Sequence, residues 1–143
     1  MRTWKTVLVG VDGSQGSRKA LTWAAAEAAD HGAELVVLNV WEHTLPPPAG
    51  SVSVSEHYVP ESSQRTTEEL LQEITEELGE NPPVPVQPRV KQGNAARVLI
   101  EESADADLLV VGTRGRGGFR GLVLGSVSQH VAAYAKCPVT VVR

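Results

Sequence analysis

Two kinds of segment alternate along this chain, and that alternation constrains the fold more than any other feature of the sequence. Short runs rich in Val, Leu and Ile are typical of β-strands, and segments whose apolar residues recur at helical spacing are typical of α-helices. The runs predict strands at 5–11, 34–40, 84–91, 107–111 and 138–142. Helices are predicted at about 17–31 and 64–78, after Asn94, and from Ser126 onward. The resulting order, β-α-β-α-β-α-β-α-β, favours an α/β fold with a parallel sheet.

The composition of the strands predicts how the sheet is built. All but the third are apolar throughout, as expected when helices cover both faces of a parallel sheet. The third contains Pro85 and Pro88, which lack the N–H that a neighbouring strand needs, so we expect it at an edge. The simplest strand order is then 3-2-1-4-5, a doubly wound, Rossmann-like parallel sheet of five strands with helices on both faces. Residues 1–143 are expected to form one domain with a variable loop at about 41–60, either a disordered linker or a binding loop.

The predicted topology also indicates where a ligand would bind. In doubly wound sheets, ligands bind beyond the carboxyl ends of the strands, where the direction of winding reverses. In the order 3-2-1-4-5 this point lies between the first and fourth strands. Asp12, Gly13 and Ser14 follow the first strand, and a glycine-rich segment at 112–125 follows the fourth. Both unusual features of the sequence therefore converge on one crevice.

The glycine-rich segment has the composition of a phosphate-binding loop. It reads GTRGRGGFRGLVLGS from Gly112 to Ser126, and glycines permit close backbone approach to a ligand. Three arginines lie in it with no acidic residue among them: Arg114, Arg116 and Arg120. Ser126 opens a helix whose N-terminal N–H groups favour an anion, and Ser126 and Gln129 have the spacing of a capping box. A flexible turn with solvated arginines is the alternative interpretation.

The familiar phosphate-binding motifs are missing. The sequence has no G-x-x-x-x-G-K-[ST] motif, and G-x-G-x-x-G fails both around Gly10 and at Arg120. The chain is therefore neither a P-loop NTPase nor an ordinary dinucleotide-binding protein by motif.

The sequence resembles the universal stress protein family. Gly112, Gly115, Gly125 and Ser126 match the pattern G-x2-G-x9-G-[ST] that ATP-binding members carry after their fourth strand. The opening TVLVGVDGS resembles the family's first strand and turn, and the terminal KCPVTVV resembles its last strand. The resemblance covers nearly the whole chain and implies the ATP-binding, single-domain type, with an adenine nucleotide alpha hydrolase-like fold.

The resemblance also implies a ligand and its contacts. The ligand is ATP, with any Mg²⁺ bound through the phosphates. Asp12 would accept hydrogen bonds from the ribose hydroxyls, Val40 would hold adenine through its backbone, and Gly10 and Val11 would lie beneath the nucleotide. The candidate residues around the phosphates are Gly112, Arg114, Gly115, Arg116, Gly117, Gly125, Ser126 and Val127. The resemblance further implies a homodimer through the strand at 138–142, which suits an apolar edge that would otherwise invite aggregation.

Features that bind a nucleotide are present, whereas features that would hydrolyse it are not evident. ATP hydrolysis needs a positioned water, a base and usually Mg²⁺. Asp12 is the acid nearest the loop in the predicted site, and the resemblance assigns it to ribose. His130 is a weak candidate for a base, and His31, His43 and His57 have no metal-binding spacing. No catalytic or metal-binding residue is therefore assigned.

These considerations favour an ATP-binding, stress-response regulatory protein that acts as a nucleotide-dependent switch on an unknown protein partner. We expect at most slow ATP hydrolysis. A weak ATPase or phosphotransferase remains an alternative, as does a dimeric interaction module that uses ATP only as a structural ligand. A receiver-like signalling domain is disfavoured, because residues 84–93 hold no acid that could be phosphorylated.

Charge and cysteine content restrict the partners and the compartment. The net charge of −4 disfavours a nucleic-acid partner, and it is concentrated at 61–80, which holds seven Glu and one Arg. We expect most of these acids to form a solvated helix face. The single Cys favours a reducing compartment, no apolar run is long enough to span a membrane, and Asp12 interrupts the N-terminal run before it reaches signal-peptide length. We therefore expect a cytoplasmic protein without a membrane partner.

Overall fold

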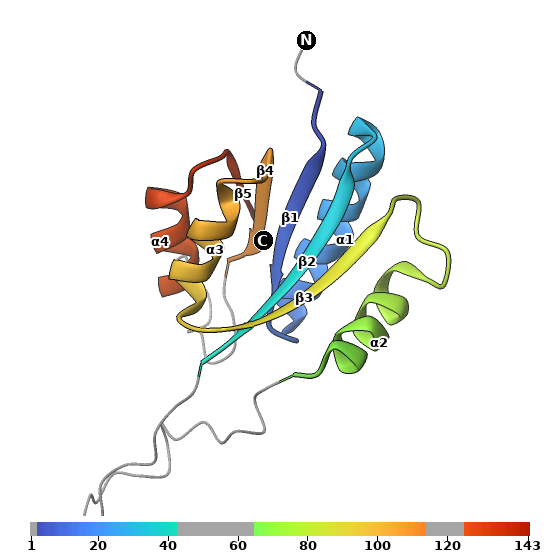
Figure 1. The fold of residues 1–143 in the computed structure, drawn as a ribbon, viewed down its shortest axis with the longest axis horizontal. Helices are drawn as coiled ribbons and strands as arrows, with labels where there is room; N and C mark the ends of the chain where they lie inside the picture. Colours follow the sequence, from blue (N-terminus) through green and yellow to red (C-terminus); the bar gives the residue numbers. More distant parts are fainter. Residues whose placement is uncertain (1–2, 43–64, 114–124) are drawn as a thin grey trace, which may run out of the picture.

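A computed structural model of the chain describes residues 3–42, 65–113 and 125–143 (Figure 1). Its elements follow the predicted order of alternating strands and helices. They are β1 (Thr6–Val11), α1 (Gln15–His31), β2 (Glu34–Trp41), α2 (Thr67–Leu78), β3 (Val86–Gln92), α3 (Ala95–Ser103), β4 (Leu108–Gly112), α4 (Ser126–Tyr134) and β5 (Val139–Val142).

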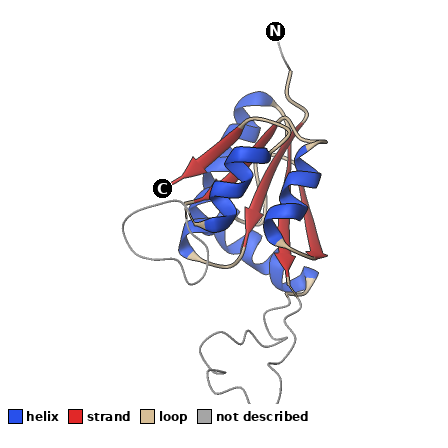
Figure 2. Cartoon of the chain, turned by 90° about the vertical axis from the view of Figure 1, so that its left-hand side faces the viewer, coloured by secondary structure: helices blue, strands red, loops and turns tan. Residues whose placement is uncertain are grey.

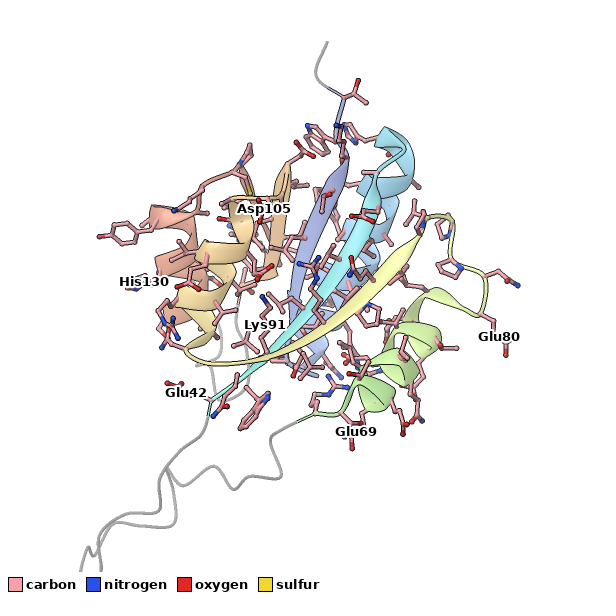
Figure 3. All side chains as sticks on the ribbon, in the orientation of Figure 1. Glu42, Glu69, Glu80, Lys91, Asp105 and His130 are labelled. Atoms are coloured by element: carbon pink, nitrogen blue, oxygen red, sulfur yellow. The ribbon has the colours of Figure 1, made fainter. Side chains whose placement is uncertain are left out.

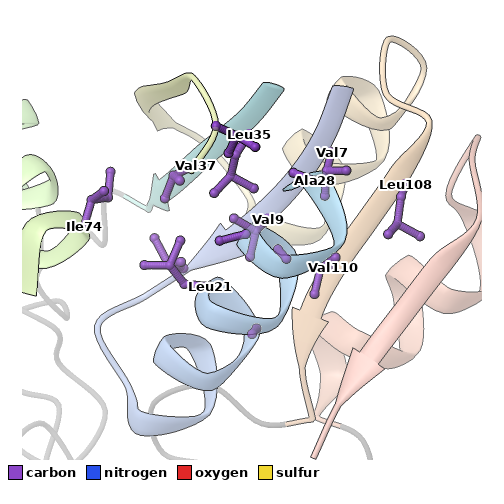
Figure 4. Close-up of a cluster of buried hydrophobic side chains, with 14 of the residues drawn as sticks. Val7, Val9, Leu21, Ala28, Leu35, Val37, Ile74, Leu108 and Val110 are labelled. Atoms are coloured by element: carbon purple, nitrogen blue, oxygen red, sulfur yellow. The ribbon is translucent and has the colours of Figure 1, made fainter. Parts of the chain in front are cut away.

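The five strands form one parallel sheet in the order β3-β2-β1-β4-β5, which confirms the predicted topology. Helices α1 and α2 cover one face, and α3 and α4 cover the other (Figures 1 and 2). Successive residues of β1 therefore point into different cores. Val9 packs with Leu21 under α1, as Figure 4 shows, whereas Leu8 packs with Leu99 under α3. This is why the central strands carry apolar residues on both of their faces.

Strand β3 lies at the sheet edge, as its prolines predicted. Pro88 stands opposite Val37 of β2. Pro85 falls just before the strand, where its carbonyl still accepts a hydrogen bond from the N–H of Leu35 at 2.9 Å. Strand β3 has β2 as its neighbour on one side and no strand of the sheet order on the other. A proline is tolerated in such a strand, because its missing N–H can be on the side that faces away from β2.

Polar residues just outside the helices determine where α1 and α2 begin. Helix α1 starts two residues earlier than predicted, because the Oγ of Ser14 accepts a hydrogen bond from the N–H of Ser17. Helix α2 starts at Thr67 because Thr66 and Glu69 form a reciprocal capping box. Both starts follow from side chains that satisfy the N–H groups of a first helical turn.

The capping box predicted at Ser126 and Gln129 is wrong. Gly125 is the N-cap of α4, and no side chain caps that helix among the described residues. The N–H of Gly125 donates to the carbonyl of Thr113 at 2.6 Å, and Gly125 has an extended conformation. Ser126 is therefore already the first residue of the helix, and its side chain is exposed.

Helix α2 is joined to α1 by charged groups, which corrects the expectation of a solvated acidic face at one position. The side chain of Glu73 is 1% exposed, and its carboxylate pairs with Arg65 and with Arg18 of α1. Arg18 also pairs with Glu76 and Glu77. Helix α2 is thus fixed to α1 by a buried carboxylate held between two guanidinium groups.

Two further expectations bear on the chain outside the core. Trp41 ends β2 and does not belong to the predicted loop, of which residues 43–60 lie outside the described residues. Within the described ranges, none of the helices has the length and apolar character that crossing a membrane requires.

Candidate functional site

The carboxyl end of β4 brings together the N-terminal turns of α1 and α4. Gly112, the last residue of β4, lies so close to α1 that an added Cβ would stand 2.9 Å from both the carbonyl carbon and the oxygen of Gly16. The Oγ of Ser128 in α4 donates to the carbonyl oxygen of Gly112 at 2.5 Å. The hydrogen bond between Gly125 and Thr113 closes the base of the glycine-rich loop at the same place. Both helix N-termini therefore flank the predicted switch point.

Asp12 is held at this point by the turn between β1 and α1. Its Oδ1 accepts a hydrogen bond from the N–H of Ser14 at 2.9 Å, and its own N–H donates to the Oγ of Ser17 at 3.2 Å. The same hydroxyl donates to the carbonyl of Ser14 at 3.1 Å. Asp12 is half-buried, and the turn holds its carboxylate at the carboxyl end of the sheet.

The ends of β1 and β2 are joined by a side chain. The Nδ2 of Asn39 donates to the carbonyl of Val11 at 2.9 Å, and these two residues are opposite each other in the sheet register. Asn39 is 3% exposed, and among the described residues its Oδ1 has no hydrogen-bond partner. Val40 comes next in β2, is half-buried and packs against the core on the α3 side. Gly10 also faces α3, where an added Cβ would lie 3.0 Å from a methyl group of Leu99.

The N-terminus of α4 differs from those of the other helices. The side chains of Ser14, Thr66 and Asn94 cap α1, α2 and α3, whereas the N-cap of α4 is a glycine. The N-cap residue of α4 therefore has no side chain that could occupy the first-turn N–H groups. Such a helix end attracts an anion through its N–H groups and its dipole.

The structure thus brings several predicted site residues together at the carboxyl end of the sheet. They are Gly10, Val11, Asp12, Val40, Gly112, Gly125, Ser126 and Val127. Gly112 has a structural role there, because its missing side chain allows the backbone of α1 to approach β4. The other predicted residues, Arg114, Gly115, Arg116 and Gly117, lie outside the described residues.

Sequence reasoning missed Ser17 and Asn39. Both are buried polar residues that hydrogen-bond the backbone around Asp12. Asn39 did leave a signal, since it is the one polar residue inside the apolar run LVVLNV of β2. Ser17 left a weaker signal, its spacing of three residues from Ser14 in a helix start.

Other reactive side chains lie away from this edge or are poorly suited to catalysis. His130 is exposed on α4, where its ring contacts that of Tyr134 at 5.2 Å between centroids (Figure 3). Cys137 is half-buried, and its burial, followed by the nearby Asp107, raises the pKa of the thiol. In the parts of the chain that the structure describes, no three His, Cys, Asp or Glu residues gather in a way that could hold a metal ion.

The sequence model of the universal stress protein family matches residues 3–143. A universal stress protein of Mycolicibacterium smegmatis is 42% identical over 139 residues, which cover 96% of this chain and 45% of that protein. The chain therefore spans about half the length of this curated relative.

Solved structures share the fold of this chain. Universal stress protein UspA from Lactobacillus plantarum has a TM-score of 0.79 at 19% identity, with 100% of both chains covered. A universal stress protein in complex with cAMP has a TM-score of 0.69 at 28% identity, with 99% of this chain and 98% of that one covered.

Proposed function

The chain belongs to the universal stress protein family, and from this premise we propose that it binds an adenine nucleotide, ATP, at the carboxyl ends of β1, β2 and β4. The observation that carries the proposal is the convergence of Asp12, the end of β2 and the glycine-capped N-terminus of α4 on one edge of the sheet. The cAMP complex of a relative at 28% identity supports an adenine nucleotide as the class of ligand.

Each part of the nucleotide has a chemically suitable neighbour. The carboxylate of Asp12 accepts hydrogen bonds from the ribose hydroxyls, and the backbone of Val40 holds the adenine ring. The first-turn N–H groups of Ser126 and Val127 bind the phosphates, together with the glycines and arginines of the loop that precedes them. The hydrogen-bonded base of that loop supports this assignment, because Gly112 and Gly125 hold its two ends beside α4. Any Mg²⁺ binds through the phosphates.

In this proposal the nucleotide regulates the protein and is turned over slowly at most. The acid at the site, Asp12, is engaged by ribose and by the N–H of Ser14, so it is poorly placed to activate a water. Binding changes the surface that an unknown protein partner contacts. The protein acts in the cytoplasm, a location that its single cysteine favours.

A homodimer through β5 is part of the proposal. Strand β5 lies at a sheet edge and pairs with β4 on its inner side. Its sequence, VTVV, gives a second copy an apolar edge to pair with. Replacing Thr140, the polar residue of β5, with Lys should convert a dimer into a monomer, as measured by light scattering after size exclusion. A wild-type monomer at the same concentration would contradict this part of the proposal.

The nucleotide itself can be tested directly. Calorimetric titration of the purified chain with ATP, after removal of any co-purified nucleotide, should show binding at one site. Asp12→Ala should weaken it roughly 10- to 100-fold, since hydrogen bonds to a charged group are lost. Asp105→Ala is the matched control, because Asp105 is an exposed acid between α3 and β4, at the amino end of the sheet (Figure 3).

Three outcomes would contradict the proposed function. If ATP, AMP and cAMP all fail to bind, the chain has no adenine-nucleotide site. If Asp12→Ala and Asp105→Ala lose affinity equally, the site is not at the carboxyl ends of the strands. If phosphate is released steadily from ATP and Asp12→Ala abolishes the release, the protein is an enzyme and not a slow switch.

A further inference from the structure

A single peptide unit, between Val11 and Asp12, is held from both sides by buried side chains. Its carbonyl accepts a hydrogen bond from the Nδ2 of Asn39 in β2, at 2.9 Å. Its N–H donates to the Oγ of Ser17 in α1, at 3.2 Å. Asn39 is 3% exposed and Ser17 is 5% exposed, so little water competes with either bond. The plane of this peptide is therefore fixed by two elements at once.

The orientation of the Asn39 amide is determined by chemistry. The carbonyl of Val11 can only accept, so the NH₂ group of Asn39 must face it and the amide oxygen must face away. That oxygen is buried and has no hydrogen-bond partner among the described residues. Because an unpaired buried acceptor is unfavourable, the amide of Asn39 carries a cost that its bond to Val11 must offset. The bond to the Val11 carbonyl is thus the described contact that accounts for an amide at this buried position.

The peptide that is held in this way carries Asp12. Rotation of the plane between Val11 and Asp12 would swing the carboxylate, whose Oδ1 accepts a hydrogen bond from the N–H of Ser14. A hydrogen bond weakens steeply when its distance or angle departs from the optimum. The direction of the Asp12 carboxylate therefore sets how well it can accept from a ribose hydroxyl.

We propose that Asn39 and Ser17 form a clamp on the Val11–Asp12 peptide that positions Asp12 for ribose, and that this clamp gives the site its preference for a nucleotide with ribose hydroxyls. The inference rests on the proposed function and deepens it. Asn39 and Ser17 are positioning residues in this scheme and act through Asp12. Because Asn39 also joins β1 to β2, it sets the spacing between Asp12 and Val40, the residues assigned to ribose and adenine.

The test compares two nucleotides that differ only in the sugar. Dissociation constants for ATP and for 2′,3′-dideoxy-ATP are measured by calorimetry on wild-type protein and on Asn39→Leu and Ser17→Ala. We expect the wild type to prefer ATP by roughly tenfold or more, the range for hydrogen bonds to a carboxylate. Both variants should reduce this preference to about twofold or less, chiefly by weakening ATP.

A matched control separates positioning from stability. Ser103 is fully buried, accepts a hydrogen bond from the N–H of Lys136 at 2.9 Å and donates to the carbonyl of Ile100, at the other end of the sheet. Ser103→Ala should lower the melting temperature much as Ser17→Ala does, yet leave the sugar preference unchanged. Circular dichroism confirms that each variant is folded, and Ser17→Ala serves should Asn39→Leu fail to fold, since alanine is a good helix former.

The outcomes distinguish this inference from the function beneath it. If the wild type prefers ATP and both folded variants keep that preference, the clamp is wrong while nucleotide binding stands. Equal loss of the preference in Ser103→Ala would also overturn the clamp, because a general loosening would then explain it. If the wild type binds neither nucleotide, the proposed function fails and the clamp fails with it.

Discussion

Replacing Gly112 with Ala tests the close approach of the end of β4 to the backbone of α1. The added Cβ would lie 2.9 Å from the carbonyl carbon and oxygen of Gly16 and 3.4 Å from the nitrogen of Ser17. Non-bonded carbon atoms are normally about 3.5–4.0 Å apart. Every atom in the way belongs to the backbone of α1, so no side chain can rotate to make room. Either α1 or the end of β4 must move.

The size of the effect follows from that overlap. Overpacking of a close-packed site costs typically about 1–3 kcal/mol, and a backbone that cannot yield should fall in the upper half of this range. A loss of about 2–3 kcal/mol lowers the melting temperature of a domain of this size by roughly 4–12 °C. Thermal unfolding followed by far-UV circular dichroism, with a urea titration for the free energy of unfolding, measures both values.

Two other glycines provide controls with different physical reasons. At Gly10 an added Cβ would lie 3.0 Å from a methyl group of Leu99, which is the flexible end of a side chain. At Gly79 nothing lies within 4 Å, but the φ of 83° is strained for any side chain. Each alanine variant should lose about 1 kcal/mol, less than Gly112→Ala. A Gly112→Ala protein as stable as the wild type, or no less stable than Gly10→Ala, would refute the reasoning.

Three other predictions concern charged and reactive groups away from the site. Arg65→Ala removes one of the two positive charges that pair with the buried carboxylate of Glu73. It should lower the free energy of unfolding, measured by urea titration, by about 2–4 kcal/mol. A loss below about 1 kcal/mol would show that the pair is dispensable. The pKa of Glu102 is lowered, first by its hydrogen bond from Lys91, so the pair stabilises the fold above the unfolded pKa near 4.5 and less as the pH falls through the folded pKa. Lys91→Met should therefore destabilise the protein at about pH 6 and have little effect at about pH 3, whereas an equal effect at both would contradict the linkage. Burial raises the pKa of Cys137, so its reaction with a disulfide reagent should be slower than that of a free thiol at neutral pH and should increase on unfolding in urea.

The sequence predicted the fold well because the fold depends on patterns that are local. Continuous apolar runs follow from burial on both faces, and Pro88 could lie only at an edge. The strand order in turn predicts that Asp12 lies at the switch point of the sheet. Patterns of this kind need only the spacing of residue types along the chain.

Features that depend on how distant residues meet were not predictable in the same way. The bond from Asn39 to Val11 requires the register of β1 against β2, which the sequence does not state. A capping box was expected at Ser126, but it does not form there because Gly125 is the N-cap of α4 and Ser126 is already helical. The capping box that the structure has lies at the start of α2, between Thr66 and Glu69. Glu73 looked like one more acid on a solvated helix, and only the packing of α2 on α1 shows that it is buried.

The proposed site has two halves that rest on different parts of the fold. The ribose and adenine half is built on β1, β2 and the start of α1, where Asn39 and Ser17 hold the peptide before Asp12. The phosphate half is built on β4 and α4, where Ser128 and Gly125 fix the helix to the strand end. The contact between Gly112 and Gly16 joins them, because it sets how closely α1 approaches β4. A nucleotide that spans both halves therefore depends on that distance, and a methyl group at Gly112 should weaken ATP more than adenosine, which needs only the first half.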